Sequence, residues 1–171
     1  MSHTTHKREA ASVARIRCAV ITCSDTRSEN EDGSGSLMKE RLLEEGHDIV
    51  LHRVVPDSPT VICALLSSLV GRVDAVLLNG GTGISRRDST FEAVSSLLEK
   101  HLPGFGELFR MLSYQEIGAA AMLSRATAGI WREMLIFSTP GSPNAVRLAL
   151  DRLILPELGH LVYEIHKQRS V

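Results

Sequence analysis

The segment whose residue types most clearly suggest chemistry is NGGTGISRRD, residues 79–88, which directly follows a short apolar run. Its three glycines let the backbone approach a ligand closely and turn several N–H groups toward it, while Thr82 and Ser85 add hydroxyl groups. The segment lacks the Gly-Lys-Ser/Thr sequence of a P-loop and the GxGxxG pattern of a dinucleotide site. It predicts a phosphate-binding loop of another kind. A tight strand-to-helix turn that merely requires glycines is the alternative.

Two aspartates could supply oxygen ligands near this loop. Asp88 closes the glycine-rich segment, and Asp57 lies in the sequence VVPDS after another apolar run. A nucleotide site needs ligands for Mg²⁺, and one or two carboxylates together with substrate phosphates suffice. Each aspartate also has an ordinary structural interpretation, because Asp88 could sit near a helix start and an aspartate beside proline is common in turns.

Further polar side chains are expected in the same region. Ser24 and Asp25 follow the first apolar run and offer a hydroxyl and a carboxylate. Ser142, in the turn PGSP that starts the last helix, is included among the expected binding residues. Ser34 has a full structural explanation, since serine is a preferred cap at a helix N-terminus.

These segments need a scaffold, and the chain predicts strands alternating with helices. Strands are expected at residues 16–23, 47–55, 74–78 and 134–138, with a short edge strand at 127–131. Helices are expected to end at Gly46, to begin at Ser58 or Thr60, and to cover 90–100 and 105–125 with a joint near Ser113. A last helix is expected from Asn144 with a kink at Pro156.

This alternation predicts an α/β fold: a doubly wound, mostly parallel sheet with helices on both faces, forming a single domain. Ligands of such sheets bind beyond the carboxyl ends of the strands. The polar, glycine-rich or Pro-Gly segments at residues 24–35, 56–58, 79–88 and 140–143 all fall at that edge. This convergence favours a binding site over four incidental turns.

Composition narrows the function. The chain has 171 residues and a net charge of −1, which gives no electrostatic reason to bind nucleic acid or a membrane surface. Residues 1–14 are polar and are expected to form a flexible tail before a domain at 15–171. The three cysteines match no zinc or disulfide spacing, so reduced, buried thiols and a cytoplasmic location are expected. The histidines at 47, 52, 101, 160 and 166 share no metal-binding spacing and are expected at the surface or at strand ends.

Taken together, six segments resemble the MoaB/Mog proteins of molybdenum-cofactor biosynthesis, in the same order along the chain. They are ITCSDTRSENEDGSG, VVPDS, NGGTGISRRDSTFEA, PGFGELFR, SYQEIGAAAMLSRATAGI and STPGSPNAV. The resemblance extends from about Arg15 to the last helix. GFGELFR and SYQEIG are closer to the MoaB branch than to the Mog branch.

The resemblance implies a doubly wound molybdopterin-binding domain that forms a homotrimer or homohexamer and contacts other enzymes of the pathway. Mog-type members transfer AMP from Mg-ATP to the molybdopterin phosphate and release pyrophosphate. Asp57 and Asp88 match the two essential carboxylates and would bind or orient Mg²⁺. The other matches are the phosphate-binding loop and the first substrate loop: Gly80, Gly81, Thr82 and Gly83, and Ser24 and Asp25.

Three residues depart from the family pattern. Asn79 stands where threonine or a similar small residue is expected, Ser58 where a second acid is common, and Phe91 where proline is usual. A molybdopterin adenylyltransferase is the preferred interpretation. The missing acid at position 58 favours the alternative of a non-catalytic pterin-binding or carrier paralogue. A flavodoxin-like redox module, of the same fold class, is a third possibility.

Overall fold

The computed structural model of the chain describes residues 15–167, so the tail expected at residues 1–14 lies outside the described residues. The described part forms one six-stranded sheet in the order β2-β1-β3-β6-β5-β4. Its first four strands are parallel and its last two are antiparallel to their neighbours. The strands are β1 (Arg17–Cys23), β2 (Asp48–Val55), β3 (Ala75–Asn79), β4 (Lys100–His101), β5 (Thr127–Trp131) and β6 (Met134–Thr139).

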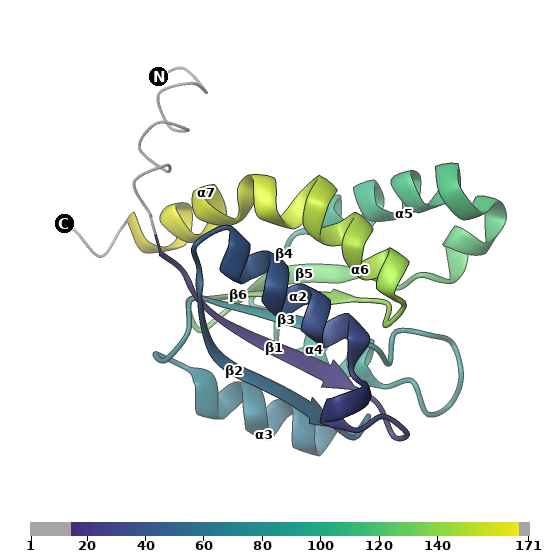
Figure 1. Ribbon diagram of the computed structural model, residues 1–171, viewed down its shortest axis with the longest axis horizontal. Helices are drawn as coiled ribbons and strands as arrows, with labels where there is room; N and C mark the ends of the chain where they lie inside the picture. The colour runs from purple at the N-terminus through teal and green to yellow at the C-terminus, as the bar shows by residue number, and fades with distance from the viewer. Residues whose placement is uncertain (1–14, 168–171) are drawn as a thin grey trace.

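Helices cover both faces of this sheet (Figure 1), as predicted. One face carries α2 (Gly33–Glu44), α5 (Pro103–Ile117), α6 (Pro143–Ala149) and α7 (Leu155–His166), and the other carries α3 (Pro59–Leu69) and α4 (Thr90–Leu97). Three short helical segments complete the chain: η1 (Glu29–Glu31), η2 (Gly118–Leu123) and the π-helical η3 (Leu150–Ile154). Within residues 15–167, no helix is long and apolar enough to cross a membrane.

The sheet divides the apolar interior into two cores. Successive side chains of a strand point to opposite faces. On β1, Cys18 and Val20 therefore pack with α2, α5, α6 and α7, whereas Ala19 and Ile21 pack with α3 and α4. Burial on both faces explains why β1, β3 and β6 are almost continuously apolar in sequence.

Two expectations about element boundaries are wrong. The helix that begins at Thr90 ends at Leu97 rather than near residue 100, because Lys100–His101 pairs with β5 as the outermost strand; β5 is therefore not the edge. The joint after α5 lies at Gly118, whose positive φ of 63° suits glycine, whereas Ser113 is buried inside the helix.

The cap of α2 also differs from the expectation. Asp32, rather than Ser34, is the N-cap and accepts a hydrogen bond of 2.8 Å from the backbone N–H of Gly35. The Ser34 hydroxyl instead donates to the carbonyl of Gly141, 2.8 Å away. This contact ties the start of α2 to the loop that follows β6.

Asp32 also belongs to a buried polar chain that lies under the carboxyl ends of the strands. Its Oδ2 accepts from the Thr22 hydroxyl at 2.7 Å and lies 2.9 Å from His52 Nε2. Because the single Thr22 hydroxyl proton goes to Asp32, Thr22 Oγ1 must accept, and the Asn79 amide nitrogen donates to it at 2.8 Å. Asn79 Oδ1 consequently points the other way and has no partner among the described residues. His52, expected at the surface or a strand end, is mid-strand and mostly enclosed.

We expect Gly35→Ala to destabilise the fold through this chain. A Cβ there would lie 2.0 Å from Asp32 Oδ2 and 2.7 Å from His52 Nε2, so the polar chain would have to open. Overpacking of this kind costs about 2–3 kcal/mol. Gly33→Ala is the matched control, because its Cβ would meet nothing within 4 Å and alanine favours the helix by about 0.5 kcal/mol. Urea denaturation of both variants would contradict this account if their free energies of unfolding were equal.

The three cysteines are free, but the expectation that all are buried holds only for Cys18 and Cys23 and is wrong for Cys63. Burial raises the pKa of the Cys18 thiol and of the Cys23 thiol to about 12. Cys63 on α3 is more accessible. The two buried thiols are therefore neutral packing groups near neutral pH.

Alkylation should follow this difference. Because burial raises its pKa to about 12, the Cys23 thiol is almost entirely protonated at pH 8, and the thiolate is the reactive form. We expect iodoacetamide to modify Cys63 in the folded protein and to reach Cys18 and Cys23 only after denaturation. Peptide mass spectrometry with and without urea measures this, and equal labelling of Cys23 in both states would refute it.

Candidate functional site

A cavity of about 530 Å³ opens at the carboxyl ends of the parallel strands, where the sequence predicted a site. Loops that follow β1, β2, β3 and β6 all contribute to it, and a fifth segment comes from the end of η2. Its lining consists of Cys23, Ser24, Asp25, Thr26, Arg27, Asp57, Gly80, Gly81, Thr82, Gly83, Arg87, Asp88, Leu123, Ser124, Pro140 and Gly141. The expected site residues are brought together here, with the exceptions of Ser142 and of Ser85, which was expected to add a hydroxyl group.

The glycines of the loop after β3 are required by close contacts as well as by backbone geometry. Gly80 and Gly81 have positive φ values of 93° and 61°. A Cβ on Gly81 would lie 2.2 Å from Asp57 Oδ2, and one on Gly83 would lie 2.6 Å from Asp88 Oδ2. The space that side chains would fill is thus taken by the two carboxylates, so the turn and the site are the same structure.

The protein holds the carbonyl groups of this loop, which directs the N–H groups of the same peptides the opposite way. The Gly81 carbonyl accepts from the backbone N–H of Thr90 at 3.1 Å, and the Thr82 carbonyl accepts from Arg125 Nε at 3.0 Å. Because a trans peptide directs C=O and N–H in opposite directions, the N–H groups of Thr82 and Gly83 point away from these partners. Neither N–H donates to another residue within 15–167. Unpaired, neighbouring N–H groups of this kind bind anions.

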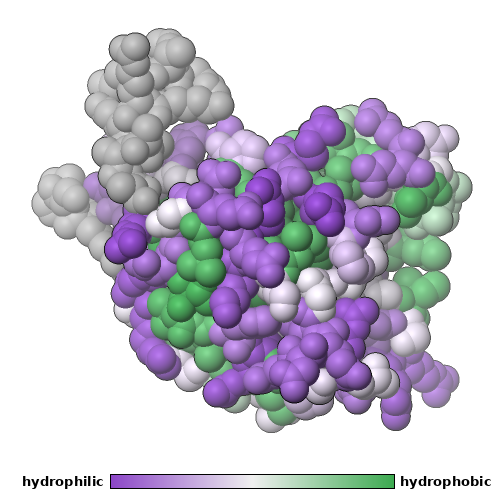
Figure 2. Space-filling view, in the orientation of Figure 1, coloured by the Kyte–Doolittle hydropathy of each residue, from purple (hydrophilic) through white to green (hydrophobic). Residues whose placement is uncertain are grey.

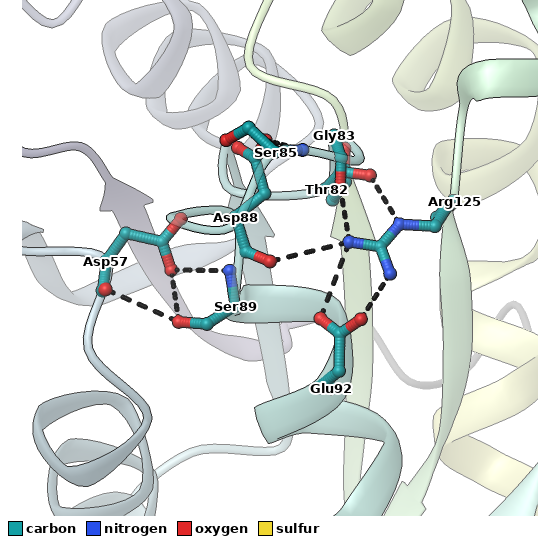
Figure 3. A network of polar contacts seen from close by, with 8 residues as sticks. All are labelled: Asp57, Thr82, Gly83, Ser85, Asp88, Ser89, Glu92 and Arg125. Carbon is teal, nitrogen blue, oxygen red and sulfur yellow. Dashed lines mark hydrogen bonds and ion pairs between the residues drawn. The ribbon is translucent and has the colours of Figure 1, made fainter.

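Asp57 is held by the start of α4. Its Oδ1 accepts from the Ser89 backbone N–H at 3.1 Å and from the Ser89 hydroxyl at 2.8 Å (Figure 3). The same oxygen accepts from the Thr90 hydroxyl at 3.2 Å. Its own backbone N–H donates to Asp25 Oδ1 at 3.1 Å. Its Oδ2 makes no hydrogen bond with the described residues and remains available at the cavity wall. Asp57 is therefore more than a turn residue after Pro56.

In Asp88, too, one carboxylate oxygen is hydrogen-bonded and the other is not. Asp88 Oδ2 accepts from the backbone N–H of Ser85 at 3.0 Å, while its backbone N–H donates to the Ser85 carbonyl at 3.1 Å. Its Oδ1 makes no hydrogen bond within the described part of the chain. Each carboxylate thus has one oxygen without a hydrogen bond among the described residues, and Ser89 rather than Asp88 occupies the cap position of α4.

The loop after β1 brings a cation, Arg27, as well as a carboxylate, and Arg87 of the loop after β3 adds a second cation. Ser24 Oγ accepts from the backbone N–H groups of Thr26 and Arg27, so its hydroxyl oxygen shapes this loop. Arg27 donates to the Gly141 carbonyl at 3.2 Å, and Arg87 lies 3.9 Å from Asp25. Both guanidinium groups belong to residues that line the cavity, and they complement an anionic ligand.

Ser142 has a different place from the one expected. Its side chain caps α6 by accepting from the backbone N–H of Ala145 at 3.2 Å, and it does not line the cavity. The neighbouring Gly141 lines it instead. The sequence interpretation of PGSP as the start of the last helix is confirmed.

Arg125 is the main residue that sequence reasoning missed. It donates to carbonyls of the glycine-rich loop and to the carboxylate of Glu92 on α4 (Figure 3). These hydrogen bonds lower the pKa of Glu92. The only sequence signal was an arginine two residues before an expected strand, whereas binding residues were sought after strands.

The donor set of the cavity fits Mg²⁺ better than a soft metal. The two available atoms are carboxylate oxygens, the ligand type that Mg²⁺ prefers, with substrate phosphates completing its shell. Within residues 15–167, no group of three or more histidine, cysteine or acidic side chains could hold a metal alone. Cys23, with its raised pKa, presents no thiolate to the cavity.

Comparison with known proteins identifies the relatives of this chain. The family model described as "Probable molybdopterin binding domain" matches residues 19–160. The molybdenum cofactor biosynthesis protein B of Bacillus subtilis (strain 168) is 52% identical over 172 residues, covering 99% of this chain and 100% of the relative.

Solved structures agree. A crystal structure of a molybdenum cofactor biosynthesis protein B is 52% identical, with a TM-score of 0.86 over 90% of this chain and 98% of the other. The tungsten cofactor synthesizing protein MoaB from Pyrococcus furiosus is 41% identical, with a TM-score of 0.81 over 88% and 97% of the two chains. The predicted doubly wound fold is confirmed, and the chain belongs to the MoaB/Mog family of molybdopterin-binding domains.

Proposed function

We propose that the protein acts in molybdenum-cofactor biosynthesis and transfers AMP from Mg-ATP to the phosphate of molybdopterin, releasing pyrophosphate. The observation that carries this proposal is the meeting, in one cavity, of the loop after β3, whose Thr82 and Gly83 N–H groups have no acceptor within residues 15–167, with one available oxygen each of Asp57 and Asp88. The N–H groups and the cationic Arg27 and Arg87 suit phosphates. The carboxylates suit the Mg²⁺ that accompanies a nucleotide.

The proposed reaction needs no covalent intermediate with the protein. Phosphoryl and nucleotidyl transfers depend mainly on in-line positioning and on neutralisation of charge. The attacking group is itself a phosphate, whose low pKa removes the need for a strong base. When bound, Mg²⁺ would be held by Asp57 and Asp88 and would neutralise phosphate charge.

A carrier that binds molybdopterin without reaction is the competing function. Its support in the sequence is the serine that replaces a second acid at position 58. In the structure Ser58 is the N-cap residue of α3 and does not line the cavity. The absence of an acid there removes no carboxylate from the cavity wall, which favours the enzyme over the carrier.

The proposal predicts loss of AMP transfer in Asp88→Asn and in Asp57→Asn. In Asp57→Asn the amide oxygen can replace Oδ1 as the acceptor for Ser89 and Thr90, so the fold should persist while the available anionic oxygen is lost. We expect a decrease on the order of a hundredfold or more in Mg²⁺-dependent pyrophosphate release, with molybdopterin binding retained. Pyrophosphate release from purified molybdopterin and Mg-ATP measures this.

Asp48→Asn is the matched control, since Asp48 is an aspartate with a half-exposed side chain at the start of β2, away from the cavity. It should release pyrophosphate at the wild-type rate. Equal rates in wild type and Asp57→Asn would refute the role of Asp57. A wild-type protein that binds molybdopterin but releases no pyrophosphate would establish the carrier.

We further propose that the protein assembles as a homotrimer or homohexamer through the outer face of α5 and η2. Apolar residues gather at this end of the molecule (Figure 2), and six large ones are at least 48% exposed: Leu108, Met111, Tyr114, Ile117, Met122 and Leu123. Several large exposed apolar side chains on neighbouring elements are typical of an association site. A second copy of the chain is the expected occupant because closed homo-oligomers are the commonest assemblies.

Assembly should be lost when charge is placed on this face. Met111→Glu puts a carboxylate at a position that is 53% exposed, where burial against a second copy would be costly. Leu43→Glu is the control, at 49% exposure on α2 outside the face. Light scattering should give a trimer or hexamer mass for wild type and Leu43→Glu and a smaller mass for Met111→Glu. A wild-type monomer at micromolar concentration would overturn this assembly.

A further inference from the structure

Arg125 lies between η2 and β5, outside every loop that the topology assigns to the site. Its guanidinium group nevertheless reaches the glycine-rich loop, where Nε donates to the Thr82 carbonyl at 3.0 Å and Nη2 donates to the Gly83 carbonyl. A longer contact of 3.5 Å joins Nη2 to the carbonyl of Asp88. All three acceptors are main-chain carbonyls of the segment that carries the phosphate-type site.

These contacts determine which way the loop presents its peptides. A planar trans peptide directs the N–H opposite to the carbonyl. Arg125 therefore holds the N–H groups of Gly83 and Ile84 on the side away from itself. Neither N–H donates to a residue within 15–167. Without the guanidinium, the carbonyls of Thr82 and Gly83 would lose the only hydrogen-bond donors that they have within residues 15–167, so these two peptides could turn.

We propose that Arg125 is a positioning residue that keeps residues 82–84 in the conformation that binds phosphate. This inference rests on the proposed function for the nature of the ligand. Arg125 itself would make no contact with substrate and would act only through the peptides that it holds.

The position of Arg125 is itself secured by α4. Its Nη1 and Nη2 pair with the carboxylate of Glu92, and its guanidinium carbon lies 4.9 Å from the centre of the Phe91 ring. Figure 3 shows the guanidinium between the loop and this helix. Only arginine combines a planar face that stacks on a ring with several fixed donors, whereas lysine offers one compact charge. Phe91, a departure from the family pattern, thus has a role in this chain.

The test compares anion binding with activity. Inorganic pyrophosphate is the probe, because it needs only the phosphate site, and titration calorimetry measures its Kd in wild type, Arg125→Gln and Arg125→Lys. Losing a hydrogen bond from a charged donor changes an equilibrium constant by a factor of about ten or more. We therefore expect the Kd for pyrophosphate to rise at least about tenfold in Arg125→Gln. Arg125→Lys, which can hold one carbonyl, should lie between the two. The KM for ATP should rise more than kcat falls, because the N–H groups already contact phosphates in the ground state.

Arg41→Gln is the matched control. Arg41 also joins acidic side chains of two elements, Glu44 and Asp151, and its side chain is 32% exposed compared with 25% for Arg125. It should leave pyrophosphate binding within twofold of wild type. Urea denaturation of both variants separates a general loss of stability from a loss of the loop conformation. If Arg125→Gln proves far less stable than Arg41→Gln, the comparison is made on Arg125→Lys, which keeps the charge.

The outcomes separate this inference from the proposed function. Tight pyrophosphate binding that Arg125→Gln weakens supports the inference even when wild type transfers no AMP, in which case the adenylyltransferase alone fails. Equal pyrophosphate binding in wild type and in folded Arg125 variants overturns the inference, whatever the activity. Absence of pyrophosphate binding in wild type also overturns it, because the loop would then be no anion site.

Discussion

Asp57 Oδ1 accepts hydrogen bonds from Ser89 and Thr90, so a carboxylate at the end of β2 fixes the start of a helix 32 residues further along the chain. This interaction holds the site together. Gly81 must approach the same carboxylate, and only glycine leaves room for it. The Asp57 carboxylate, the start of α4 and the glycine-rich loop therefore depend on one another. A residue that only contacted the ligand could be replaced without changing the fold. Asp57, in contrast, also fixes the positions of the loop after β2, the glycine-rich loop and the start of α4.

The features that sequence alone predicted are those that depend on the sheet. The apolar runs of β1, β3 and β6 mark strands buried on both faces, and their carboxyl ends necessarily bring the following loops to one edge. Ser24, Asp57 and Gly80 could thus be assigned to one site from the order of strands and loops alone. What could not be predicted was set by pairing and packing. Lys100–His101 is a strand only because β5 offers a partner, and the side chain of Ser142 caps α6 rather than facing the cavity.

Arg125 was missed for a topological reason. In the parallel part of the sheet, the chain reaches the site edge only when it leaves a strand. Because β5 runs antiparallel to β6, with Thr127 opposite Ser138, the chain reaches the same edge as it enters β5. A single reversed strand therefore delivers a residue from before a strand to a site otherwise built from residues after strands. The rule that ligands bind beyond the carboxyl ends of parallel strands does not identify a residue that precedes an antiparallel strand.

The antiparallel strand β5 also brings the end of the exposed apolar face and the residue that contacts the glycine-rich loop onto one short stretch of backbone. The exposed apolar face of α5 and η2 ends at Leu123, which itself lines the cavity, and Arg125 follows two residues later. The proposed association face and the residue proposed to orient the glycine-rich loop are thus joined directly by the backbone, rather than through a long chain of packed side chains. If η2 shifted when two molecules associated, the free energy of ligand binding would change with it. Because such coupling is reciprocal, ligand binding in the cavity would change the free energy of association by the same amount.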